Sequence, residues 1–170
     1  MNQRRVIYFF GLIFIVFISS CEEKNTPVET DKNSQLISFT GCKSTKNLYA
    51  TDSVTANQSC IEFSYTDNTL LLTHINAGFN CCPGEITADF TFSGNAISIS
   101  ENESAADCDC DCLYDLEMQI TSLSPGIYNF IFIEPYAMQP GQEIAFTLNL
   151  NDSVSGIYCV DRNHYPWGIF

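Results

Sequence analysis

The chain has 170 residues, a formal net charge of −13 from 7 Lys and Arg against 20 Asp and Glu, and nine cysteines. This length holds one domain of ordinary size rather than two. So large a negative charge argues against nucleic acids and anionic membrane surfaces as partners, because both repel it. An apolar content of 45% argues against a disordered acidic chain. The sequence therefore predicts one folded domain, and its composition points to no particular activity.

Residues 1–20 have the organisation of an export signal. Arg4 and Arg5 precede an apolar run, Val6–Ile18, that is too short to span a bilayer comfortably as a helix. The run ends in Ile-Ser-Ser-Cys, which resembles the lipobox of bacterial lipoproteins, although Leu is commoner than Ile at its first position. This ending favours a cleaved signal over an uncleaved anchor or a core helix. The resemblance implies cleavage before Cys21 and acylation of Cys21.

Cleavage and lipidation would change both the charge and the membrane contact of the chain. Loss of residues 1–20 leaves 5 Lys and Arg against 20 Asp and Glu, a net charge of −15. Two or more acyl chains give stable anchoring, so the membrane is an expected partner through lipid alone. Residues 22–34 are polar and charged, and we interpret 21–34 as the lipidated cysteine and a flexible tether. Glu22, Glu23 and Lys24 loosely resemble the charged signals of outer-membrane lipoproteins, although a plain solvated linker fits equally well.

Residues 35–170 have the two-residue period of β-strands. Apolar and polar residues alternate through Ile86–Phe92, Tyr114–Ile120 and Phe146–Leu150, which predicts half-buried strands. Tyr128–Ile133 has few polar residues, which predicts a central strand covered on both faces. Turn-forming residues separate such segments at 67–68, 93–95, 124–126, 140–141 and 151–152. No helical stripe occurs. We therefore expect an all-β fold, an antiparallel β-sandwich of about eight or nine strands.

With Cys21 assigned to lipid, eight cysteines remain, an even number that predicts structural disulfides in an exported chain. Adjacent cysteines bond only with strain, and cysteines two apart on a strand lie roughly 6.6 Å from one another. We therefore expect at least one of the adjacent pair to bond to one of the closely spaced trio, closing a loop of roughly 30 residues. The eight are Cys42, Cys60, the pair Cys81 and Cys82, the trio Cys108, Cys110 and Cys112, and Cys159.

Two alternatives for the cysteines are a thiolate metal site and a thiol-redox centre. Both are less favoured, because the sequence has no Cys-x-x-Cys and only two histidines. The carboxylates of Asp107, Asp109 and Asp111 would also raise the pKa of neighbouring thiols, whereas a reactive cysteine needs a low pKa.

The acidic residues and histidines suggest no catalytic or metal site. Four acidic residues have odd numbers, so a straight strand would place their side chains on one outward face: Asp109, Asp111, Asp115 and Glu117. They form either a weak Ca²⁺ site or, as we favour, a solvated strand face. His74 and His164 lie in no catalytic or metal-binding pattern and are interpreted as incidental. We therefore expect no enzymatic activity and no cofactor.

The C-terminal segment is rich in aromatic residues and follows Arg162. Trp167 and Tyr165 are weak candidates for stacking on a sugar, but capping of the core, with Arg162 packed on an aromatic or paired with an acid, is preferred. The Asp-Ser-Val sequences at 52–54 and 152–154 are similar to sequons that are O-glycosylated in exported Bacteroidota-type proteins.

Three of these features together carry a family resemblance. They are Asn80-Cys81-Cys82-Pro83, the Cys-x-Cys-x-Cys-x-Tyr-Asp-Leu sequence at 108–116, and the closing Arg162 with Tyr-Pro-Trp at 165–167. They resemble a group of small uncharacterised Bacteroidota-type lipoproteins. The resemblance implies a lipid-anchored protein of the outer membrane, at its periplasmic face or the cell surface. It implies no activity. We expect a non-enzymatic binding or structural module with an unknown protein or glycan partner, and the alternatives are a carbohydrate-binding accessory module and a thiol-redox or metal-binding protein.

Overall fold

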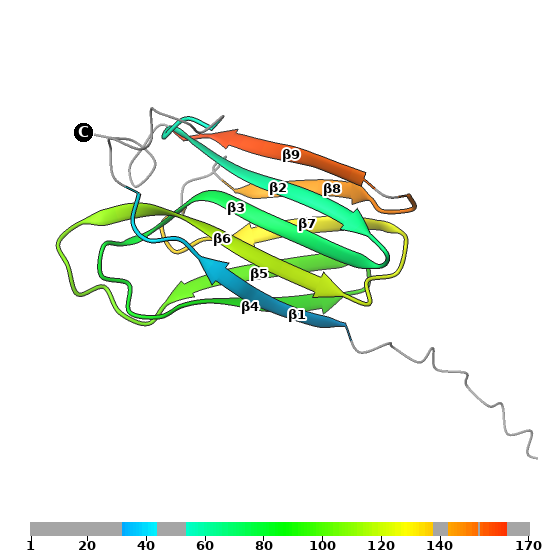
Figure 1. Ribbon diagram of the computed structural model, residues 1–170, viewed down its shortest axis with the longest axis horizontal. Helices are drawn as coiled ribbons and strands as arrows, with labels where there is room; N and C mark the ends of the chain where they lie inside the picture. The colour runs from blue at the N-terminus through cyan, green and yellow to red at the C-terminus, as the bar shows by residue number, and fades with distance from the viewer. Residues whose placement is uncertain (1–31, 44–53, 138–142, 153, 163–170) are drawn as a thin grey trace, which may run out of the picture.

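The computed structural model describes residues 32–43, 54–137, 143–152 and 154–162, which form two packed sheets (Figure 1). Within these ranges the fold is all-β, and no helix has the length and apolar character needed to cross a membrane. The first strand begins two residues ahead of the domain start expected at 35. The nine strands are β1 (Asn33–Phe39), β2 (Gln58–Thr66), β3 (Thr69–Asn80), β4 (Ile86–Ser93), β5 (Ala96–Glu103), β6 (Asp111–Thr121), β7 (Ile127–Ile133), β8 (Ile144–Asn149) and β9 (Val154–Asp161).

The two sheets are joined by repeated crossings of the chain. One sheet has five strands in the order β1-β6-β3-β2-β9, and the other has four in the order β4-β5-β7-β8. The fold is the β-sandwich that the sequence predicts, with one departure from antiparallel pairing: β5 and β7 run parallel. The chain leaves β5 for β6 in the opposite sheet and returns to β7, and this long excursion allows parallel neighbours without a helical crossover.

The core lies between the sheets and follows the predicted alternation. The inward side chains of β6 are buried from Tyr114 to Ile120, and those of β8 and β4 pack into the same cluster. The expectation for β7 was wrong in one respect. Its inward side chains are buried, but Ile127, Ile131 and Ile133 on the outer face are 54%, 42% and 52% exposed. β7 is central because β5 and β8 flank it, whereas no described element covers its outer face.

The predicted turns that fall on described residues lie between strands, except that Ser93 is the last residue of β4. Asp67 and Asn68 join β2 to β3 and both have positive φ, the backbone of a tight hairpin whose twist matches its strands. Gly94, also with positive φ, begins the turn between β4 and β5. The segment at 140–141 lies outside the described residues.

A one-residue bulge at Asn76 changes the register of β3. Ile75 pairs with Asp115 and Ala77 with Tyr114, so Asn76 is the extra residue, and its φ is +64°. Inward positions therefore change from even to odd along β3. The buried Asn76 amide donates to the carbonyls of residues 55 and 58, and its oxygen accepts from Lys43. The bulge thus holds the backbone at the start of β2 and just before it against β3.

Candidate functional site

The structure pairs all eight cysteines between 42 and 159, which confirms the disulfide prediction. Three bonds lie where β1 and β3 end and β6 begins, and the fourth joins β2 to β9. The bonds are Cys42–Cys112, Cys81–Cys110, Cys82–Cys108 and Cys60–Cys159. The adjacent cysteines Cys81 and Cys82 both bond to members of the closely spaced trio, with sequence separations of 29 and 26 residues. These separations agree with the predicted loop of roughly 30 residues. We call the first three bonds the disulfide cluster.

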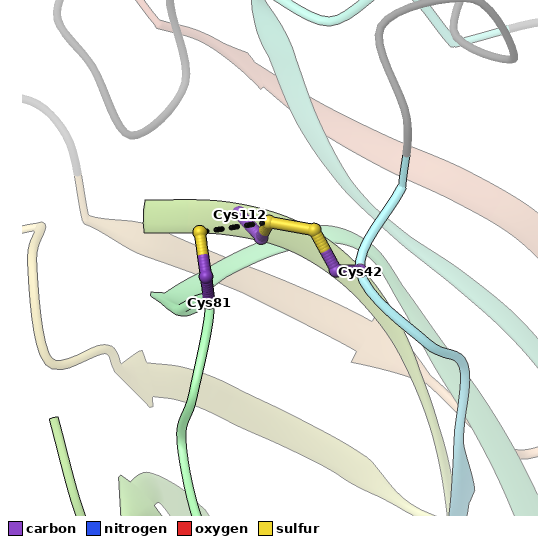
Figure 2. A group of neighbouring side chains, drawn as sticks. All are labelled: Cys42, Cys81 and Cys112. Atoms are coloured by element: carbon purple, nitrogen blue, oxygen red, sulfur yellow. Dashed lines mark hydrogen bonds between the residues drawn. A yellow bond between two sulfur atoms is a disulfide. The ribbon is translucent and has the colours of Figure 1, made fainter. Parts of the chain in front are cut away.

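Two bonds of the disulfide cluster touch each other. The Sγ atoms of Cys112 and Cys81, which belong to different bonds, lie 3.3 Å apart (Figure 2). Cys42 and Cys110, at the far ends of these two bonds, are exposed, while Cys81 and Cys112 are half-buried. The cluster is therefore a continuous chain of four sulfur atoms that reaches solvent at both ends.

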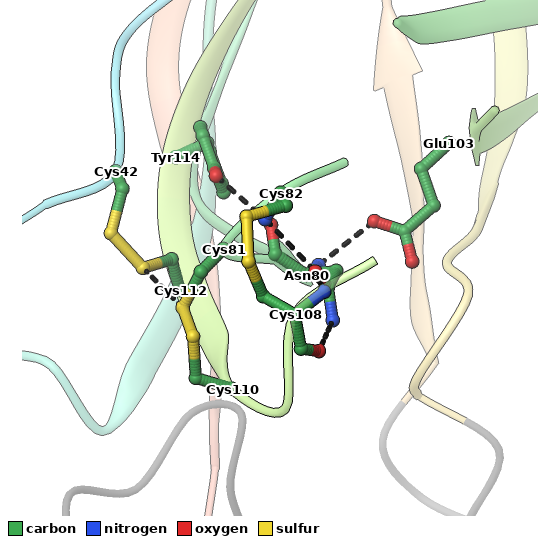
Figure 3. Close-up of a disulfide and its surroundings, with 9 residues drawn as sticks. All are labelled: Cys42, Asn80, Cys81, Cys82, Glu103, Cys108, Cys110, Cys112 and Tyr114. Carbon is green, nitrogen blue, oxygen red and sulfur yellow. Dashed lines mark hydrogen bonds between the residues drawn. A yellow bond between two sulfur atoms is a disulfide. The ribbon is translucent and has the colours of Figure 1, made fainter. Parts of the chain in front are cut away.

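Asn80 organises the backbone of the disulfide cluster (Figure 3). Its side-chain oxygen accepts hydrogen bonds from the backbone N–H groups of Cys82 and Cys108, at 2.9 and 3.1 Å, and its amide donates to the Cys108 carbonyl at 2.7 Å. The Asn80 carbonyl accepts from the Tyr114 hydroxyl, and its N–H donates to Glu103. One buried side chain thus holds together the two segments that the Cys82–Cys108 bond joins, which gives a physical reason for asparagine before the cysteine pair.

The four acidic residues considered as a Ca²⁺ site do not converge. Asp109 is exposed and precedes β6, while Glu117 accepts a hydrogen bond from Ser38 across the sheet. Asp115 lies 2.6 Å from the Lys43 ammonium group. Burial raises the pKa of Asp111, and the charges of Glu103 and Asp109 add to the effect. No three of the four bring carboxylate oxygens close enough to share one ion.

Several predicted residues fall outside the described ranges. These are the lipidation candidate Cys21, the sugar-stacking candidates Tyr165 and Trp167, the second histidine His164, and the serines of the two Asp-Ser-Val sequences, Ser53 and Ser153. Arg162 is described, and it pairs with an acid, one of the two structural roles expected for it.

A second cluster, which sequence reasoning missed, lies buried between the sheets. His74 on β3 accepts or donates at both ring nitrogens: Nδ1 lies 2.7 Å from Glu101 Oε1, and Nε2 lies 2.7 Å from Ser59 Oγ. Glu134, just after β7, lies 3.6 Å from His74 Nε2 and binds the Arg162 guanidinium at 2.6 Å. The side chains of this charge cluster come from both sheets, and none of the five residues is more than 6% exposed.

The surroundings of His74 favour its protonated form. Burial alone would lower the pKa of His74, but the carboxylate of Glu101, together with that of Glu134, outweighs it and raises the pKa above its ordinary value. Burial raises the pKa of Glu134 against the opposing charges of His74 and Arg162. With His74 protonated, two carboxylates face two cations and the cluster is neutral. Neutrality suits a buried site, because an unbalanced charge there is strongly unfavourable.

The chemistry open to the charge cluster is limited by its burial. Ser59, His74 and Glu101 form the hydrogen-bond chain of a nucleophile, base and orienting acid. Ser59 is fully buried, however, so no substrate carbonyl can reach its hydroxyl. His74, Glu101 and Glu134 also offer three ligand atoms within 4.8 Å of one another. A divalent cation would give the cluster a net positive charge beside Arg162, whereas a proton makes it neutral. The arrangement therefore suits a proton and a structural role.

A groove opens on the outer face of the same strands. Thr73 and Ile75 flank His74 in the chain but point away from the core, and they contribute to a groove of about 600 Å³ over β2, β3 and β9. Leu71 and Ile157 are 45% and 50% exposed in it. It is an open surface with mixed polar and aliphatic character. Its lining residues are Glu62, Phe63, Ser64, Leu71, Thr73, Ile75, Ser155, Gly156 and Ile157.

Comparison with known proteins adds no relative. No protein-family profile, curated protein or solved structure matches the chain. The four disulfides nevertheless indicate a protein that works outside the cytoplasm, because such bonds form and persist in oxidising compartments. The chain is an exported protein.

Proposed function

We propose that the protein is a lipid-anchored, non-enzymatic binding module of the outer membrane. The observation that carries the lipid anchor is the cysteine pairing. Every cysteine from Cys42 to Cys159 has a partner, so Cys21 is the single cysteine of the sequence outside these four bonds. It follows an apolar run and two serines, the setting in which a lipoprotein cysteine is acylated. This supports a lipid at Cys21 and a sandwich held at the membrane by a short tether.

Burial supports a non-enzymatic role. The one hydrogen-bond chain in the described residues with the order of a catalytic triad, Ser59–His74–Glu101, has no exposed member. The exposed groove over β2, β3 and β9 has Glu62 as its single ionisable lining residue, without a second acid or base beside it in that lining. The Cys60–Cys159 bond joins two of its strands, β2 and β9, and the charge cluster links β3 to the opposite sheet through His74 and Glu101. A rigid surface of this kind is suited to binding rather than to group transfer.

Labelling in cells tests the anchor. The full chain is expressed in a diderm bacterium grown with an alkyne fatty acid, beside Cys21→Ser. We expect the wild-type protein to take up the label and to partition with detergent and outer membranes, while the variant stays unlabelled and aqueous. Protease treatment of intact cells then separates the cell surface from the periplasmic face. Equal labelling of Cys21→Ser would refute the anchor.

A second candidate, carbohydrate binding, is favoured by the composition of the groove. Ser64, Thr73 and Ser155 offer hydroxyl groups and Glu62 offers a carboxylate beside the exposed side chain of Ile157. Sugar rings carry hydroxyl groups at their edges and apolar patches on their faces, so such a lining is complementary to them. Phe63 is the groove's single aromatic lining residue, and its half-buried ring stacks on Phe146 in the core.

Matched isoleucines on the two outer faces test the carbohydrate candidate. Ile157→Ser alters the groove, whereas Ile127→Ser removes an isoleucine of similar exposure from the other sheet. On a glycan array, binding should be lost in Ile157→Ser and kept in Ile127→Ser. Trp167→Ala reports on the aromatic tail: loss of binding there with an intact groove would move the sugar site to the tail. Absence of glycan binding by the wild-type protein would remove this candidate and leave the anchor untouched.

A further inference from the structure

Within the disulfide cluster, the contact between Cys112 and Cys81 joins two bonds that are otherwise independent. Their Sγ atoms lie 3.3 Å apart and are not bonded to each other. The sulfurs of Cys42, Cys81 and Cys112 all lie within 4.8 Å of one another. Disulfides exchange when a thiolate attacks a sulfur of an intact bond, so a thiolate released at Cys112 would form already in contact with its target.

We propose that the Cys42–Cys112 and Cys81–Cys110 bonds form a thiol-accepting exchange site, which takes up an external thiol at Cys42 and releases a thiol at Cys110. Cys42 is the exposed end of the first bond and Cys110 that of the second, so both the entry and the exit face solvent. The inner cysteines, Cys81 and Cys112, are half-buried and in contact, so exchange at the first bond can pass to the second through them (Figure 2).

The exchange proceeds in two balanced steps. An external thiolate attacks Cys42 Sγ, forms a mixed disulfide with it, and the electron pair of the broken bond leaves on Cys112. The Cys112 thiolate then attacks Cys81 Sγ, forms a Cys81–Cys112 bond and expels Cys110 as a thiolate, which takes a proton from water. The number of disulfides is unchanged, and no oxidant or reductant other than the entering thiol is used.

Charge selects the class of thiol. Asp107 and Asp109 are exposed beside the cluster, and the half-buried Asp111 follows Cys110. Lys43, the residue that follows Cys42, lies against the Asp115 carboxylate. An acidic surface raises the local concentration of cations and lowers that of anions. The partner is therefore a cationic or uncharged thiol rather than an anionic one.

Peptide mapping of the wild-type protein tests the transfer. The oxidised protein is treated briefly with 2-mercaptoethanol under native conditions, quenched in acid, alkylated and digested with pepsin at low pH. We expect the adduct on Cys42, the alkyl group on Cys110 and a new Cys81–Cys112 bond. An alkyl group on Cys112 with the Cys81–Cys110 bond intact would overturn the proposal.

Two single variants provide a matched test. Cys110→Ser leaves the thiol of Cys81 beside the Cys42–Cys112 bond, so the free thiol should divide between Cys81 and Cys42. Cys108→Ser leaves Cys82 with no such contact, so its free thiol should stay on Cys82. Each variant lacks one bond, and circular dichroism checks that both fold. A free thiol confined to Cys81 in folded Cys110→Ser would contradict the transfer. The wild-type mapping remains decisive if that variant does not fold.

A series of small thiols tests the partner class. At equal thiolate concentration, cysteamine should form the Cys42 adduct fastest, 2-mercaptoethanol more slowly and 2-mercaptoethanesulfonate slowest. The differences should shrink as salt screens the acidic surface. Equal rates at low ionic strength would overturn the assignment to cationic or uncharged thiols.

Discussion

The disulfide cluster and the charge cluster join strands of the sandwich by opposite chemistry. The disulfide cluster is covalent, and its Cys42–Cys112 and Cys81–Cys110 bonds are in contact through Cys112 and Cys81. The outer cysteines of these two bonds, Cys42 and Cys110, are exposed to solvent. The charge cluster is non-covalent and lies between the sheets, with every member at least nine-tenths buried. A covalent link keeps its strength in water, whereas an ion pair at the surface is worth little and gains strength only where water is excluded. The first cluster should therefore respond to thiols and the second to protons.

The largest effect is expected where a buried charge loses its partner. Arg162→Met keeps a long side chain but leaves Glu134 facing no guanidinium. The free energy of unfolding should fall by about 3–5 kcal/mol, because an uncompensated charge remains buried. Urea denaturation with the disulfides intact measures the loss. The double variant Arg162→Met with Glu134→Gln should recover much of it. A loss in the single variant below about 1 kcal/mol would show that the pair does not hold the sheets.

A smaller effect is expected from the polar side chain that supports the covalent cluster. Asn80→Ala removes the acceptor of two backbone N–H groups and the donor to one carbonyl. We expect a loss of about 1–3 kcal/mol, because buried polar groups lose their partners while the bonds themselves remain. Thermal denaturation under non-reducing conditions measures it. Asn102→Ala, at an exposed asparagine with hydrogen bonds of its own, is the matched control and should cost about 0.5 kcal/mol or less.

The third effect is a pH dependence of stability, which we expect from the charge cluster and not from the disulfide cluster. The raised pKa of His74 means that the folded state holds a proton that the unfolded state releases. Its contribution is therefore fully present below the unfolded value of about 6.5 and is lost as pH rises through the folded value. The raised pKa of Glu134 acts in the same direction. Stability should decline toward alkaline pH by at most about 1.4 kcal/mol per pH unit for one proton.

His74→Gln isolates this proton from the repulsion among the other acids. The variant should be less stable at pH 6 but should show a flatter decline between pH 6 and 9 than the wild-type protein. Urea titrations across this range measure the slope. An unchanged slope in the variant would mean that His74 carries no linked proton, and the contrast between the clusters would then rest on thiols alone.

The sequence predicts those parts of the fold that depend on local pattern. Alternation along 114–120 identifies both the strand and its buried face, because a two-residue period has the same meaning wherever the sheet lies. The same reasoning fails for β7, whose exposed Ile131 looks like a core residue. Whether an outer face is covered depends on other elements, and the local pattern holds no information about them.

The charge cluster illustrates a different limit. His74 is separated by 27 residues from Glu101, and its other charged neighbours lie farther along the chain, so no motif connects them. One signal was present in the sequence. Glu101 continues the inward alternation of Ile97 and Ile99, and His74 continues that of Leu70 and Leu72. A charged residue at an inward strand position requires a buried partner, and two such positions together indicate a shared cluster.

The place of β9 at the edge of the five-stranded sheet determines when the protein can be completed. Exported chains emerge from the N-terminus, and β9 is the last of the described strands to arrive, although its partner β2 is the second of them. The native bond of Cys60 cannot form until Cys159, 99 residues farther along the chain, has crossed the membrane. Arg162, the residue that follows β9, completes the charge cluster. A chain that ends before Cys159 therefore lacks both the Cys60–Cys159 bond and the buried Arg162 that pairs with Glu134. The stability of the fold thus depends on translocation of the whole domain.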